Sequence, residues 1–163
     1  MGRQAMEYIN RILVTGGVTK CFRKALQYGI SLSRKYDAEI YILHVVHNPF
    51  GYEGFNLPMI SLDKEYENLL RDAKYELDKI VEEERAKGLP IQSLINEGEP
   101  AKMILKLIED KNIDLLIMLA HKESRLEHLE SRLERLIFGR SYEALIRKMP
   151  CPILLVDQDL AVC

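Results

Sequence analysis

The chain has 163 residues, of which 47% are hydrophobic and 29% charged, and its formal net charge is −2. This balance is typical of one soluble globular domain, and it disfavours disorder and nucleic-acid binding through a basic surface. We expect no membrane span and no signal peptide, because no apolar run reaches ~18 residues and residues 1–10 lack an apolar stretch. Three cysteines without CxxC spacing favour a reducing, cytoplasmic compartment.

Apolar and amphipathic segments alternate along the first part of the chain. Residues 12–14 are an apolar run that leads into a Thr-Gly-Gly turn, and residues 39–46 are rich in β-branched and aliphatic side chains. Both patterns are typical of buried strands. Between them, helical spacing from about residue 19 to residue 35 places one face on Phe22, Ala25, Leu26, Gly29, Ile30 and Ser33. We therefore predict a strand, a helix and a second strand.

The rest of the chain repeats this alternation after a Pro- and Gly-containing loop at 47–59. Gly88 and Pro100 indicate a helix end and a helix start, because glycine accepts a left-handed backbone and proline fits a first turn. Strands that alternate with helices indicate a parallel sheet, in which ligands bind beyond the carboxyl ends of the strands. The further elements predicted are helices at about 61–87, 100–112 and 141–148 and strands at 91–95, 114–120 and 153–156.

Four stretches in order resemble the universal stress protein family: residues 12–46, 98–118, 138–149 and 150–156, the last reading PCPILLV. The resemblance implies a single domain over residues 1–163. It implies an α/β fold with a five-stranded parallel doubly wound sheet in the order 3-2-1-4-5 and helices on both faces. Such a fold is Rossmann-like and similar to the adenine nucleotide alpha hydrolases. The resemblance also implies a homodimer formed through the last strand, with Ile153 and Leu155 as contacts.

One branch of the resembled family binds ATP through an Asp after the first strand, a G-x-x-G after the fourth and a later Gly-Ser. In this chain Gly17 stands at the place of the Asp, and residues 119–122 contain neither glycine of the G-x-x-G. Gly139 matches the later glycine, but Arg140 stands where the family has Ser. Because a Cβ crowds a backbone that must close around phosphates, we predict a degraded ATP site.

The residues that would hold a nucleotide or another anion are Thr15, Gly16, Gly17, Val45, Gly139, Arg140 and Ser141. Three alternatives stay open at this site: ATP bound in the family's manner, no nucleotide at all, and a different anion held by Arg140, Lys122 and the Gly16-Gly17 turn. Our main hypothesis is that no nucleotide binds, and that the chain is a small cytoplasmic stress-response protein that is not an enzyme and acts through dimerisation and protein contacts. The alternative is an adenine-nucleotide-binding module, for ATP or AMP, with altered phosphate loops.

The segment 122–138 is an insertion relative to the resembled family, and its leucines are spaced 3-4-3 as in a heptad seam. These leucines are Leu126, Leu129, Leu133 and Leu136. Glutamates and arginines form separate stripes along the segment, so a parallel partner helix would meet opposite charges. A helix of this length is marginal alone. We therefore expect the leucines either to pack on their own domain or to bind a protein partner.

No other pattern in the sequence predicts a catalytic or metal centre. His44 lies inside an expected strand, where we predict that it is packed and binds no ligand. His47 and His121 follow strands at the ligand edge, but no paired metal-ligand spacing accompanies them, and no G-x-S-x-G elbow is present. Cys21, in an expected first helical turn, leaves a redox-sensing thiol as a minor hypothesis.

Overall fold

The computed structural model describes residues 8–16, 22–46, 60–97, 99–120, 143–148 and 150–157. Over these ranges strands and helices alternate in the predicted order. The strands are β1 (Arg11–Thr15), β2 (Glu39–Val46), β3 (Ile91–Glu97), β4 (Leu115–Leu119) and β5 (Ile153–Val156). The helices are α1 (Phe22–Tyr36), α2 (Ile60–Ala86) and α3 (Pro100–Lys111), and residues 143–148 are also helical.

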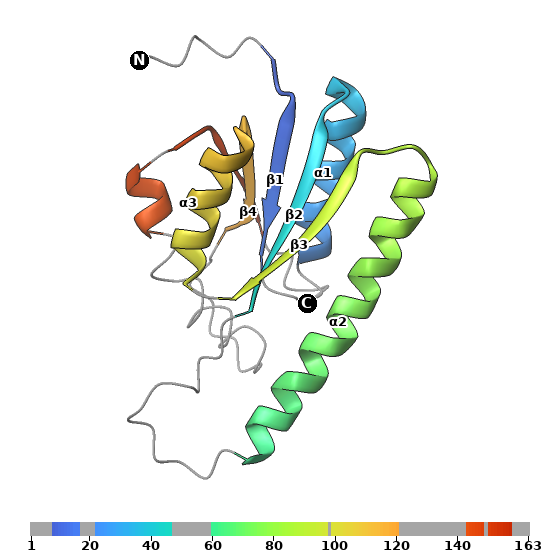
Figure 1. Cartoon of the computed structure of the whole chain (residues 1–163), viewed down its shortest axis with the longest axis vertical. Helices are drawn as coiled ribbons and strands as arrows, with labels where there is room; N and C mark the ends of the chain where they lie inside the picture. Colours follow the sequence, from blue (N-terminus) through green and yellow to red (C-terminus); the bar gives the residue numbers. More distant parts are fainter. Residues whose placement is uncertain are drawn as a thin grey trace.

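The five strands form one parallel sheet with the order β3-β2-β1-β4-β5 (Figure 1). This confirms the predicted fold class, an α/β doubly wound sheet in the order 3-2-1-4-5. Apolar side chains of α1 and α2 pack on one face of the sheet, and those of α3 and residues 143–148 pack on the other. The chain therefore has a separate hydrophobic cluster on each side of the sheet.

Helix α1 lies close to the sheet because a glycine faces the strands. A Cβ at Gly29 would lie 2.5 Å from Val14 Cγ2 and 2.9 Å from Ile40 Cδ1, so only glycine allows this approach. The whole face predicted to be apolar is buried: Phe22, Ala25, Leu26, Gly29, Ile30 and Ser33. The Ser33 hydroxyl donates to the Ala38 carbonyl at 2.5 Å, which closes the end of the helix onto β2.

Several element boundaries differ from the prediction by one or two residues. Strand β3 extends beyond residue 95, because Asn96 and Glu97 continue the ladder opposite Val45 and Val46. Strand β4 begins after Asp114, a residue predicted to be part of it. Helix α2 ends at Ala86, and the chain leaves it through Gly88 at φ +87°, as the glycine predicted.

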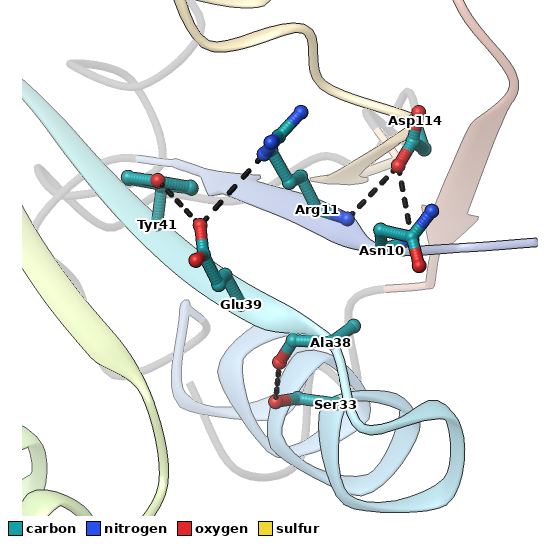
Figure 2. A network of polar contacts seen from close by, with 7 residues as sticks. All are labelled: Asn10, Arg11, Ser33, Ala38, Glu39, Tyr41 and Asp114. Carbon is teal, nitrogen blue, oxygen red and sulfur yellow. Dashed lines mark hydrogen bonds and ion pairs between the residues drawn. The ribbon is translucent and has the colours of Figure 1, made fainter.

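Polar side chains join the amino ends of the strands (Figure 2). Oδ2 of Asp114 accepts the backbone N–H groups of Asn10 at 2.9 Å and Arg11 at 3.0 Å. The Tyr41 hydroxyl donates to Glu39 Oε2 at 2.8 Å, and burial together with this bond raises the pKa of Tyr41. The network lies at the edge opposite to the predicted ligand edge, so its effect is on the fold.

Helix α2 is 27 residues long and docks on the sheet near its carboxyl end, where Leu77 and Val81 are buried. Figure 1 shows its first turns lying beyond the carboxyl ends of the strands. Its exposed surface is strongly charged, as at Lys74, Glu76 and Asp78. Among the described residues, no helix combines the length and hydropathy that crossing a bilayer requires.

Candidate functional site

The predicted ligand edge is formed by the carboxyl ends of three neighbouring strands. Strand β1 pairs with β2 on one side and with β4 on the other, so Thr15 and Gly16 lie between the ends of those two strands. Val45 lies near the end of β2. The structure thus brings these three predicted residues to one edge. The other predicted ligand residues, Gly17, Gly139, Arg140 and Ser141, lie outside the described residues.

Thr15 places a buried hydroxyl at this edge, and no described residue forms a hydrogen bond to it. Its side chain is 1% exposed, and Oγ1 has no hydrogen-bond partner in the part of the chain that the structure describes. In the sheet register Thr15 lies between Leu43 and Met118, two buried residues of the α3-side cluster. A buried hydroxyl without a partner costs about 1–3 kcal/mol. A polar group arriving at this edge would therefore gain by bonding to it.

Gly16 is held against the first residue of α1. A Cβ at Gly16 would lie 2.5 Å from Cδ2 of the Phe22 ring, so the ring packs directly on the backbone of the turn. This agrees with the interpretation of Gly16 as part of a tight strand-to-helix connection. The helical spacing predicts Phe22 on the apolar face of the helix, but it does not predict the contact of its ring with the turn.

His44 packs behind the turn, on the opposite face of the sheet from Thr15. Its ring lies edge-on to Phe22, with 5.7 Å between the ring centroids and 67° between the planes. The side chain is 4% exposed, which confirms the prediction that it is packed. Burial lowers the pKa of His44 to about 4, while the charge of Asp78 raises it and that of Lys74 lowers it. The imidazole is therefore neutral at pH 7.

A groove of about 870 Å³ runs between α1 and α2. Two ion pairs join the helices along it, Arg23–Glu76 at 2.7 Å and Arg34–Glu84. The bond from Lys87 and the charge of Arg34 hold the pKa of Glu84 below its usual range. None of the described ligand residues, Thr15, Gly16 and Val45, lines this groove, so we regard it as the seam between two paired helices rather than the ligand site.

The predicted dimer strand lies at one edge of the sheet. Strand β5 pairs with β4 on one side, and within the described ranges no strand covers its other side. Ile153 is half-buried and Leu155 is 39% exposed. The other predicted contact residues, Leu126, Leu129, Leu133 and Leu136, lie outside the described residues, as does all of segment 122–138.

The described residues contain no cluster of three His, Cys, Asp or Glu side chains that would hold a metal ion. Cys151 is buried and forms no disulfide. Cys21, His47 and His121, which the sequence analysis considered for redox or metal chemistry, lie outside the described residues. The described part of the site therefore offers one buried hydroxyl, a glycine turn and an aromatic contact behind it.

Comparison with known sequences identifies a family with this organisation. The model of the universal stress protein family matches residues 9–157 of the chain. Universal stress protein MJ0531 of Methanocaldococcus jannaschii is 29% identical over 137 residues, which cover 83% of this chain and 74% of that protein. Universal stress protein MJ0577 of the same organism is 26% identical over 132 residues, or 74% of this chain and 77% of that protein.

Solved structures show the same fold. The structure of MJ0577 matches with a TM-score of 0.62 at 24% identity and covers 93% of this chain and 97% of that one. A universal stress protein family protein of Arabidopsis thaliana, solved with AMP bound, matches with a TM-score of 0.57 at 15% identity. This match covers 93% of this chain and 94% of that one. At these identities the likeness establishes the arrangement of strands and helices.

Proposed function

We propose, because the chain belongs to the universal stress protein family, that it is a small cytoplasmic stress-response protein and not an enzyme. In this proposal it acts as a homodimer and through protein contacts, and its ATP site is degraded. The observation that carries the proposal is the apolar outer edge of β5, on which no described strand lies.

An edge strand is a template for pairing with another chain, because one row of its backbone groups has no partner strand. Strand β5 has the sequence ILLV, with no polar residue, and leaves Leu155 39% exposed. Strand β3, at the opposite edge, also exposes an apolar side chain, Ile95 at 47%. Its sequence, IQSLINE, contains polar and charged residues along its length, which disfavours pairing with a second copy. The difference in sequence between these two edge strands favours β5 as the dimer edge.

Leu155→Glu should convert the dimer into a folded monomer, because the substitution places a charge in the proposed interface. The measurement is light scattering coupled to size-exclusion chromatography, with far-UV circular dichroism to establish folding. Ile95→Glu is the matched control, since it makes the same change at the opposite edge, and it should stay dimeric. A wild-type protein of 18.9 kDa in solution, or equal loss of the dimer in both variants, would reject the β5 dimer.

The second candidate function is adenine-nucleotide binding through altered loops. Two observations favour it. The buried hydroxyl of Thr15 at the carboxyl edge of the sheet has no hydrogen-bond partner among the described residues, and AMP is bound to the Arabidopsis protein of the same fold. A hydroxyl that is already desolvated makes a hydrogen bond to a ligand at little further cost. In this alternative Thr15 would meet a polar atom of the nucleotide.

Thr15→Val should weaken AMP or ATP binding about 10-fold or more, since it leaves a ligand atom without its partner. Thr15→Ser, which keeps the hydroxyl, should bind nearly as the wild type does. Calorimetric titration measures both affinities. Urea unfolding should show Thr15→Val to be at least as stable as the wild type, which separates a binding role from a structural one. No wild-type binding at millimolar nucleotide would reject this alternative and leave the dimer proposal standing.

A further inference from the structure

His44 lies where three elements meet: β2, which carries it, and the two helices that cover its face of the sheet. From α1 the Phe22 ring contacts it, with centroids 5.7 Å apart. From α2 the charges of Lys74 and Asp78 act on it. Neither ring nitrogen has a hydrogen-bond partner among the described residues, although the side chain is 96% buried. A titratable group is therefore enclosed beside the middle of α2, and no described residue holds it by a hydrogen bond.

The same contact reaches the candidate ligand turn. The Phe22 ring that touches His44 also packs against Gly16, where a Cβ would come within 2.5 Å of the ring. The residue after Phe22, Arg23, forms the 2.7 Å ion pair with Glu76 of α2. A displacement of α2 at this level would thus act on the start of α1 and on the turn at once. The path runs from α2 through His44 and Phe22 to Gly16.

We propose that His44 is a proton-sensitive latch whose protonation releases the docked part of α2 from the sheet and, through Phe22, loosens the turn at Gly16. By the docked part of α2 we mean residues 74–81, which lie beside His44 and contain the buried side chains Leu77 and Val81. The inference is independent of the dimer and nucleotide proposals, because it concerns how two parts of one chain move together.

The physical basis is that the site tolerates a neutral imidazole but not a charged one. Burial in an apolar environment disfavours the imidazolium, and no acceptor within the described residues bonds to the ring. The charged groups that face it come from α2: Asp78 favours protonation, and Lys74, 4.0 Å from Asp78, opposes it. The other neighbours, Phe22 from α1 and the register neighbour Ile95 from β3, carry no charge.

The protonated ring reaches water most easily by displacing α2. The parallel ladder from β2 to β3 runs through His44, and the ladder from β2 to β1 ends at Leu43, the residue before it. Over residues 74–81, whose side chains the structure describes, α2 is held by two buried apolar side chains, Leu77 and Val81, and its Lys74–Asp78 pair is half-exposed. Local opening generally occurs where buried apolar contacts are few. We therefore expect the helix, and not the sheet, to give way.

Amide hydrogen exchange followed by NMR tests the latch on the full-length protein. If the ring has its ordinary pKa of 6.5 in the open form and one of about 4 in the closed form, the opening equilibrium should rise on the order of 50-fold between pH 7.5 and pH 4.5. The amides of Leu77 and Val81 should lose protection by that factor after correction for intrinsic exchange. The amides of Ile104 and Ile108 in α3 should exchange only through global unfolding, so they should stay better protected than the α2 amides at every pH.

Three variants test whether His44 causes the response and whether Phe22 passes it to the turn. His44→Phe, which cannot titrate, should abolish the loss of protection, whereas His128→Phe, the same change in segment 122–138, should retain it. In Phe22→Leu the α2 amides should still respond to acid, but the chemical shift of the Gly16 amide should no longer follow them. Equal protection of the α2 and α3 amides at pH 4.5, or an unchanged response in His44→Phe, would overturn the latch. If the chemical shift of the Gly16 amide still follows the α2 amides in Phe22→Leu, the proposed coupling of the latch to the turn is wrong.

Discussion

Acidification from pH 7.5 to pH 4.5 should remove about 2–3 kcal/mol more stability from the wild-type protein than from His44→Phe. The pKa of His44 is lowered to about 4 in the fold, chiefly by burial, and returns to about 6.5 when the chain unfolds. Between these values the unfolded chain binds more protons than the folded one. Stability is therefore complete above about pH 6.5 and is lost as the pH falls toward 4.

Urea unfolding at pH 7.5, 6.5, 5.5 and 4.5 measures this difference, with protein concentration held fixed because dimerisation would shift the apparent stability. Groups such as Glu84, whose pKa lies below its usual range, contribute to acid sensitivity equally in both proteins, so they cancel in the comparison. His44→Gln, polar but not titratable, should follow His44→Phe. If all three proteins lose stability in parallel, His44 does not titrate on unfolding and the latch has no energetic basis.

The fold was largely predictable because its signals are local. The face of α1 could be named from helical spacing, and all of it is buried. The strands could be located from short apolar runs, since a sheet covered on both faces needs apolar side chains in succession. Their spatial order came from the resemblance of four stretches to a known family, and the sheet has that order. The boundaries at residues 95 and 114 were wrong because partner strands and side-chain contacts set them.

The candidate site was predictable only where it lies on the sheet. Thr15, Gly16 and Val45 meet at one edge because parallel strands end together. The contact between Phe22 and His44 could not be predicted, since it joins residues 22 positions apart through the packing of a helix on a strand. The lack of a hydrogen-bond partner for the Thr15 hydroxyl among the described residues could not be predicted either. It depends on the register neighbours of Thr15, Leu43 and Met118. Periodicity shows which face is buried but not which polar atom lacks a partner there.

Asp114→Ala should lower the free energy of unfolding by about 2 kcal/mol at pH 7. In the sequence this residue looked like the first position of a strand, but its carboxylate accepts the backbone N–H groups of Asn10 at 2.9 Å and Arg11 at 3.0 Å (Figure 2). It thus fixes the start of β1 beside the start of β4, two segments more than 100 residues apart in the chain. Hydrogen bonds to a charged acceptor contribute about 1.5–3 kcal/mol each, and we discount the pair because the site is partly exposed.

Asp114→Asn keeps one acceptor oxygen without the charge, so its free energy of unfolding should fall between those of the wild type and the alanine variant. Asp110→Ala is the matched control: it removes a carboxylate from an exposed position of α3 and should change stability by no more than about 0.5 kcal/mol. Urea unfolding at one protein concentration gives all four values. The amide of Arg11 should also exchange faster in Asp114→Ala, because its acceptor is gone. Equal stability of Asp114→Ala and Asp110→Ala would mean that the backbone ladder Arg11–Thr15 alone positions β1, and that the carboxylate is dispensable.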